Sequence, residues 1–102
     1  MSKSIFIVKI TYVRPTEEID ALLESHGKFL EKHFHTGRFI SAGRQLPRTG
    51  GIILCHGADK LEVAQLLTED PFYVNKVADY DIIEFTASKA SNDFRTLLDN
   101  LG

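Results

Sequence analysis

Four stretches of the chain have strand-like runs of apolar residues, which predicts four β-strands. Residues 4–13 are dense in β-branched and aromatic side chains on both alternating faces, a pattern typical of a central strand. Residues 38–43, 50–57 and 78–86 predict the other three strands. The connection between the second and third strands is short and contains Pro47, so we expect these two strands to form a hairpin.

Between the first two strands the apolar spacing changes to three and four residues, which predicts a helix over residues 16–36. Pro15 and two acidic residues in the first turn favour its start, and Gly37 favours its end. Gly27 is the expected weak point, because a glycine inside a helix costs about 1 kcal/mol relative to alanine.

Two further helices are predicted after the hairpin. Asp59 is followed three positions later by Glu62, as in a capping box, and the helix that starts there is expected to run through Leu67. Residues 91–101 carry spaced apolar side chains and predict a short terminal helix. The element order is therefore β-α-β-β-α-β plus a C-terminal helix.

This order matches the ferredoxin-like split βαβ arrangement, an α+β fold in which both main helices cover one face of an antiparallel sheet. The opposite face is then bare, although the first strand carries apolar side chains on both faces. A second copy of the chain is the natural cover, so we predict a homodimer with stacked sheets. We expect one domain over residues 1–102, with a core over about 4–85 and a C-terminal helix over about 91–101.

Composition narrows the class of protein and its partners. The 102 residues, 43% hydrophobic and 25% charged, suit one soluble domain. No apolar run is longer than a strand and the N-terminus lacks a signal-peptide pattern, so we expect a cytoplasmic protein with no membrane span. The formal net charge of -2 argues against a nucleic-acid partner. Cys55 is the only cysteine and is expected to be a buried apolar residue.

His26 is the first candidate for chemistry, since helical spacing places it on the same stripe as the apolar Leu22 and Phe29. A buried imidazole needs a hydrogen-bond partner, because an unpaired buried polar group costs about 1 to 3 kcal/mol. A backbone carbonyl would make His26 a structural residue. A carboxylate would make it a candidate general base.

Asp70 is the second candidate, and it has two interpretations. It precedes Pro71, so it is a good N-cap for a short helical turn through Lys76. In a split βαβ topology the two main helices lie side by side, so a carboxylate at the end of the second can approach an inward histidine on the first. A carboxylate that holds one ring nitrogen fixes the tautomer and leaves the other nitrogen to act as a base.

Four segments together resemble the YciI-like (YCII-related domain) family: "SHGKFL" around His26, "GRFISAG" over 37–43, "GGIIL" over 50–54 and "LLTEDPFYVNKV" over 66–77. The resemblance extends over about residues 4–85. Its most specific element is the Asp-Pro-Phe at 70–72, which follows a helix that itself follows a strand beginning with Gly-Gly.

The resemblance implies a dimeric α+β barrel built from ferredoxin-like halves, with His26 and Asp70 as a His–Asp pair in a pocket proposed as the active site. It also implies chemistry on small molecules, since the family includes a dehydrochlorinase of a chlorinated hydroxyhydroquinone. Two features depart from the family pattern. Arg44 stands where proline is common, and a helix is added beyond the last strand.

Four residues are candidates for binding a substrate. Ser41 and Gly43 lie on the strand beside the expected pocket, where glycine lets a ligand approach the backbone, although plain strand packing explains them equally well. Arg44, together with Arg48, could bind a carboxylate or phenolate, or could simply be solvated. Phe72 could line the pocket or belong to the core.

Two functions remain open from the sequence. The first is a small-molecule enzyme of lyase or hydrolase type, in which Asp70 orients His26 as a general base and no cofactor is needed. The second is a noncatalytic module in which this pair holds the helices together, while the pocket binds a metabolite or the dimer serves as an assembly unit. No metal site is expected, because His26 and His33 lie about 10 Å apart along a helix.

Overall fold

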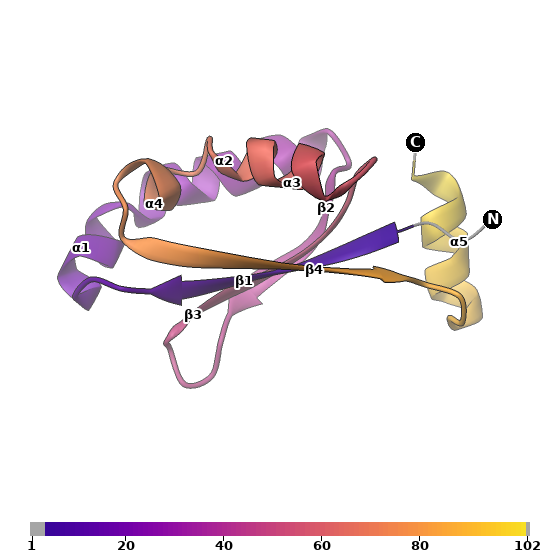
Figure 1. The fold of residues 1–102 in the computed structure, drawn as a ribbon, viewed down its shortest axis with the longest axis horizontal. Coiled ribbons are helices and arrows are strands. Elements are labelled where there is room, and N and C mark those ends of the chain that lie inside the picture. Colours follow the sequence, from indigo (N-terminus) through magenta and orange to yellow (C-terminus); the bar gives the residue numbers. More distant parts are fainter. Residues whose placement is uncertain (1–3, 102) are drawn as a thin grey trace.

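Four strands form one antiparallel sheet in the structure, a computed structural model that describes residues 4–101 (Figure 1). The strands are β1 (Ser4–Tyr12), β2 (Phe39–Arg44), β3 (Gly50–His56) and β4 (Ala78–Thr86), in the order β2-β3-β1-β4 across the sheet. β1 is central and pairs with β3 and β4 along its length, and β2 pairs with β3 as the expected hairpin. The predicted α+β fold with a four-stranded antiparallel sheet is confirmed.

The helices lie on one side of the sheet, with the exception of the last. They are α1 (Thr16–Ala21), α2 (Leu23–His35), α3 (Lys60–Leu67), α4 (Pro71–Val74) and α5 (Asn92–Asn100). Figure 1 shows α2, α3 and α4 above the sheet, α1 beside the end of β1, and α5, in yellow, at the far end of β4. Within residues 4–101, no helix combines the length and hydropathy that crossing a membrane requires.

The first helix differs from its prediction, because the structure breaks it at Leu22 into α1 and α2 instead of continuing over 16–36. Leu22 has φ -106° and ψ 0°, and its N–H donates to the Ile19 carbonyl three residues back. The break allows α1 to bury Ile19 and α2 to bury Phe29 against the same sheet. Gly27 lies inside α2 without interrupting it, since packing of an apolar face outweighs its propensity cost.

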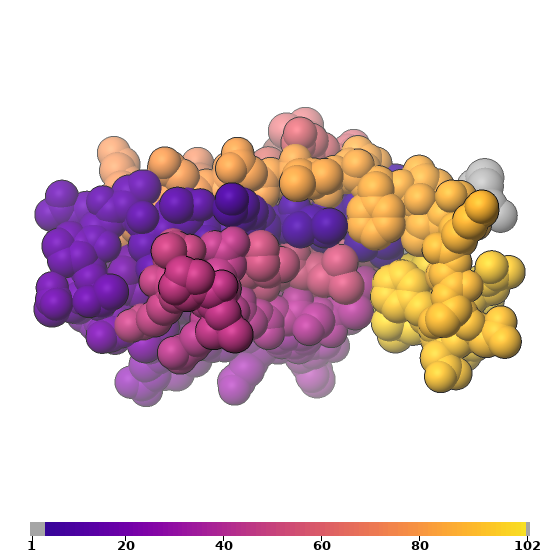
Figure 2. Space-filling model, turned by 90° about the horizontal axis from the view of Figure 1, so that it is seen from below, coloured from indigo at the N-terminus to yellow at the C-terminus, as the bar shows by residue number. Residues whose placement is uncertain are grey.

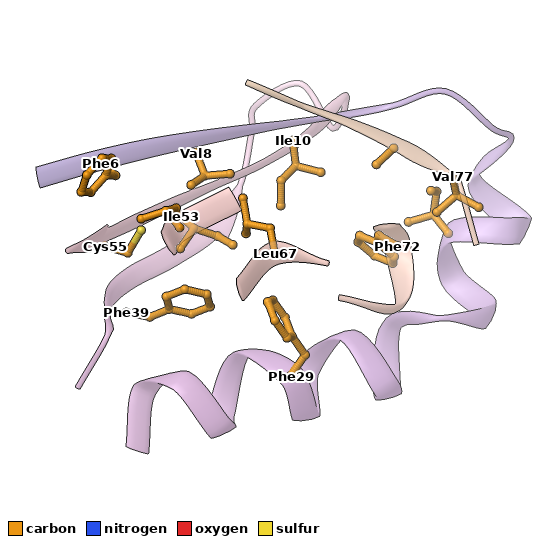
Figure 3. Packing of buried hydrophobic residues seen from close by; sticks show 13 residues of the cluster. Phe6, Val8, Ile10, Phe29, Phe39, Ile53, Cys55, Leu67, Phe72 and Val77 are labelled. Carbon is orange, nitrogen blue, oxygen red and sulfur yellow. The ribbon is translucent and has the colours of Figure 1, made fainter. Parts of the chain in front are cut away.

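The core fills the layer between the sheet and α1 to α4 (Figure 3). Phe6, Val8 and Ile10 alternate along β1 and point toward the helices, and none of them is more than 2% exposed. Phe29 of α2 and Phe72 of α4 enter the same layer from the helix side. This packing holds the short α4 beside α2, and the candidate site lies between these two helices.

Two glycines are required by the backbone of this scaffold. Gly50 pairs with Thr11 at the start of β3, and a Cβ atom there would overlap the carbonyl group of Ile10. Gly37 follows α2 with a φ of 84°, the left-handed conformation that ends many helices, as its position in the sequence predicted.

The opposite face of the sheet is open over much of its area (Figure 2). Ile83 and Phe85 of β4 point to this face and are 55% and 42% exposed. Ile5 of β1 points to the same face but is fully buried, at the end where α5 lies and buries Leu98. The C-terminal helix therefore covers one end of the face only, and the dimer expected to cover the rest stays a prediction.

Candidate functional site

His26 lies in the first turn of α2 and faces a cavity between the helices and the sheet. Its side chain is 14% exposed, and its Nδ1 lies 2.8 Å from Oδ1 of Asp70. The ring stacks on that of Phe72, with the ring centroids 4.0 Å apart and the planes within 8° of parallel. The imidazole is therefore fixed by a hydrogen bond at its edge and by an aromatic ring against its face.

Asp70 joins α3 to α4 and is fully buried. Its Oδ1 accepts from the backbone N–H of Phe72 at 3.0 Å, with Pro71 at the first position of α4, so it is the predicted N-cap. The same oxygen accepts from His26, so the two interpretations of Asp70 from the sequence hold together. An aspartate before a proline ends one helix, starts the next and leaves its carboxylate between α2 and the sheet.

Tyr80 of β4 completes this network, although it was not among the candidates from the sequence. Its hydroxyl donates to Oδ2 of Asp70 at 2.6 Å. Burial raises the pKa of the Tyr80 phenol above its ordinary value, and the hydrogen bond and charge of Asp70 raise it further. The alternation along 78–86 does place Tyr80 on the helix-covered face with Ile82, but that signal does not identify its partner.

The three donors to Asp70 determine what His26 can do. A carboxylate only accepts hydrogen bonds, so Nδ1 of His26 carries the proton that is shared with Asp70. The other ring nitrogen, Nε2, has no hydrogen-bond partner within residues 4–101. A neutral imidazole held in this tautomer can accept a proton at Nε2 while a buried carboxylate stabilises the resulting cation.

The cavity beside His26 has a volume of about 170 Å³. Gly43, Arg44 and Phe72, three of the candidate substrate-binding residues, line it. Ser41 does not line it: this residue pairs with Leu54 and faces a second hollow on the outer side of the sheet. The binding roles of these residues remain predictions, and the placement of Ser41 argues against a contact with a ligand beside His26.

Two further polar residues line the cavity. Tyr12 of β1 is one, and Arg48, from the connection between β2 and β3, is the other. The guanidinium carbon of Arg48 lies 5.9 Å from the centroid of the Tyr12 ring, and Nη2 of Arg48 lies 2.6 Å from Oδ1 of Asp20. The rest of the wall is largely apolar, with side chains that include Ile10, Leu23, Leu30 and Ile53.

A second histidine of α2 makes a parallel contact outside the cavity. His33 is buried, and its Nε2 lies 3.0 Å from Oε1 of Glu69, which also accepts from Lys32 at 2.9 Å. Lys32 first, and then His33, hold the pKa of Glu69 below its ordinary value. Glu69 and Asp70 are consecutive, so each holds one histidine of α2, but only His26 faces the cavity.

The comparisons with known proteins agree with this architecture. The model of the YCII-related domain matches residues 5–86, which confirms the resemblance found in the sequence. The chain is also similar to a solved structure of 5-chloro-2-hydroxyhydroquinone dehydrochlorinase from Burkholderia phenoliruptrix in complex with 2,5-dihydroxybenzoquinone. The TM-score is 0.66 at 17% identity, over 87% of this chain and 97% of that chain, and at this identity the likeness shows the fold alone. No curated protein matches the chain.

Proposed function

This chain belongs to the YCII-related domain family, and from that premise we propose that it is a small-molecule enzyme with His26 and Asp70 as a general acid/base pair. The observation that carries the proposal is the 2.8 Å contact between His26 Nδ1 and a fully buried carboxylate, at the wall of a cavity. The dehydrochlorinase activity of the structural neighbour, an elimination from a small ring compound, supports a reaction of lyase or hydrolase type.

In the proposed reaction, Nε2 of His26 removes a proton from a hydroxyl group or an acidic C–H bond of the substrate. Asp70 stabilises the imidazolium that forms, because Nδ1–H already donates to its carboxylate. The electron pair that this leaves on the substrate breaks the bond to the departing group. That group takes up the proton from Nε2–H as it leaves, which returns the imidazole to its neutral form. These steps use side chains of this chain alone, and Tyr80 and Phe72 act by keeping Asp70 and the imidazole in position.

We further infer that the active form is a homodimer, with the second copy covering the outer face of the sheet. The exposed Ile83 and Phe85 support this inference, since a monomer would leave these apolar side chains in water. α5 covers only the end near Ile5 and leaves room for a partner over the remainder.

Two readouts test the catalytic proposal: solvent-deuterium exchange detects abstraction of a proton from a C–H bond, and product formation detects abstraction from a hydroxyl group, whose proton exchanges with D₂O without catalysis. We would incubate the protein in D₂O with single-ring quinols, 5-chloro-2-hydroxyhydroquinone among them, and with small enolisable acids, and follow C–H exchange and product formation by NMR. General-base catalysis contributes about 10²- to 10⁴-fold, so His26→Gln should lower the rate by about 100-fold or more. His26→Gln also loses a donor to the buried Asp70, so its rate is measured at a temperature at which the variant is folded, with Asp70 still held by Phe72 and Tyr80.

His33→Gln is the matched control. His33 lies on the same helix and contacts a carboxylate at a similar distance, yet it does not line the cavity. We expect His33→Gln to retain the wild-type exchange rate under conditions in which it is folded. Equal losses in the two variants, or an unchanged rate in His26→Gln, would contradict the proposed role of His26.

The competing function is a noncatalytic binding module, and one feature favours it. Asp70 caps α4 and is buried, so its contact with His26 could serve only to join α2 to α4. Under this function, panel compounds would shift NMR signals of cavity residues without any exchange or turnover in the wild type. His26→Gln would then lower the melting temperature substantially and leave no rate to lose.

A further inference from the structure

The wall of the cavity carries positive charge, although the chain as a whole has a formal net charge of -2. Arg44 and Arg48 line the cavity, and among the described residues that line it there is no aspartate or glutamate. Charges on a concave wall with apolar surroundings are screened less than charges on an open surface. The cavity is therefore suited to a ligand of negative charge.

Arg44 has a side chain that is free to bind such a ligand. It ends β2 at the cavity, and its guanidinium has no hydrogen-bond or ion-pair partner within residues 4–101. A guanidinium presents five N–H donors in a planar arrangement that matches the two oxygens of a carboxylate. An arginine with no partner at the edge of a cavity has all of these donors available.

Arg48 is positioned at the same wall but is held by a contact that a ligand can displace. Its partner is Asp20, whose side chain is 54% exposed, while that of Arg48 is 28% exposed. Ion pairs with this degree of exposure contribute little to stability, so a carboxylate in the cavity can compete with Asp20. The Tyr12 ring lies 5.9 Å from the guanidinium carbon, so it keeps Arg48 at the wall after a ligand carboxylate has displaced Asp20.

The dimensions of the cavity limit the rest of the ligand. Its volume is about 170 Å³, and an apolar protein cavity of roughly 150 Å³ accommodates benzene. Leu23, Leu30 and Phe72 supply an apolar wall for a ring of this size. We propose that the cavity binds a single-ring carboxylic acid, with Arg44 and Arg48 as the site of its carboxylate. This inference rests on the proposed function in one respect, which is that the cavity is taken to be the substrate site.

Benzoate and its neutral isostere benzamide test the inference directly. We would measure both dissociation constants by NMR titration at pH 7.5 for the wild type, Arg44→Gln and Arg48→Gln. The wild type should bind benzoate about tenfold or more tightly than benzamide, with a preference that falls as salt is added. Each arginine variant should lose most of this preference while its affinity for benzamide stays close to that of the wild type.

Two additional variants make the test sharper. Arg14→Gln is the matched control, because Arg14 also pairs with an acidic residue, Glu18, but does not line the cavity. It should leave both affinities unchanged. Asp20→Asn removes the competitor of Arg48 and should tighten benzoate binding several-fold, an effect opposite in sign to that of the arginine variants.

Several outcomes would overturn the inference. These are equal affinities for benzoate and benzamide, no binding of either compound, or a preference that survives in both arginine variants. Binding of 4-nitrophenolate without binding of benzoate would show that the site recognises a phenolate and not a carboxylate. This result would also overturn the inference. The proposed function is tested separately. If benzoate binds through the arginines but no acid shows exchange or turnover, the catalytic proposal is refuted and the binding inference stands.

Discussion

Replacing Tyr80 by phenylalanine tests the network that holds Asp70 in place. The substitution removes one hydroxyl group and keeps the aromatic ring of Tyr80, which packs against the core. Oδ2 of Asp70 then loses the donor that lies at 2.6 Å, while Oδ1 keeps its contacts with His26 and Phe72. The change therefore isolates a single hydrogen bond to a fully buried carboxylate.

The expected loss follows from the burial of the acceptor. A buried polar group that loses its partner costs about 1 to 3 kcal/mol, and hydrogen bonds to charged groups are at the upper end of the range. We expect Tyr80→Phe to lower the free energy of unfolding by about 2 to 3 kcal/mol. For a domain of this size, about 2 kcal/mol corresponds to a fall in melting temperature of roughly 8 to 16 °C.

Equilibrium unfolding in urea, followed by far-UV circular dichroism, measures this difference, since the chain contains no tryptophan. Tyr73→Phe is the matched control. Tyr73 lies beside Tyr80 with ring centroids 5.8 Å apart, is 47% exposed, and its hydroxyl has no hydrogen-bond partner within residues 4–101. Its loss should change the free energy of unfolding by no more than about 0.5 kcal/mol.

The pH dependence gives an independent check with a defined sign. Because the pKa of Tyr80 is raised in the folded state, its contribution to stability is complete below about pH 10, the ordinary pKa of a phenol, and is lost as the pH rises further. The stability difference between the wild type and Tyr80→Phe should therefore be largest near pH 8 and narrow above pH 10. Equal stability of the Tyr80 and Tyr73 variants at pH 8 would refute the role of the hydroxyl.

Three other predictions concern the core, the scaffold and the assembly. Burial raises the pKa of the Cys55 thiol to about 11, so a thiol reagent at pH 8 should label the folded protein about tenfold or more slowly than the urea-unfolded chain. Gly50→Ala should lower the free energy of unfolding by about 2 kcal/mol or more in a urea titration, because its Cβ overlaps the Ile10 carbonyl. Gly43→Ala, whose Cβ would meet no atom within 4 Å, should be close to neutral. Light scattering should show a dimer that Ile83→Lys dissociates, and a wild-type monomer at micromolar concentration would contradict the dimer.

Local physical chemistry made most of the elements predictable. Asp59 accepts a hydrogen bond from the backbone N–H of Glu62, and Gly37 takes a positive φ after α2, as their positions in the sequence indicated. The break at Leu22 was not predictable from spacing, because the residues on both sides continue a helical pattern. The break accompanies the burial of Ile19 in α1 and of Phe29 in α2, which is a property of the packed chain.

The candidate site was predictable only in part. Helical spacing correctly directed His26 toward the sheet, and the Asp-Pro pair correctly predicted a cap at Asp70. Ser41 was expected beside the cavity, but it lies on the outer face of the sheet. The pairing of β2 with β3 shifts in register between Phe39 and Ser41. A bulge of this kind reverses the side to which a residue points, and strand periodicity alone does not reveal it.

The order of the strands and helices, their caps and the placement of an imidazole on an apolar helix face follow from the amino-acid sequence without the fold. These features depend on residues within a few positions of one another, so spacing and side-chain chemistry are sufficient to predict them. Which atoms meet depends instead on the packed chain. His26 and Asp70 are 44 positions apart, and the hydroxyl of Tyr80 reaches the second oxygen of Asp70 from another strand. Such contacts form only when the helices and strands are packed in their final positions on the sheet. The spacing of residues along the chain does not predict those positions.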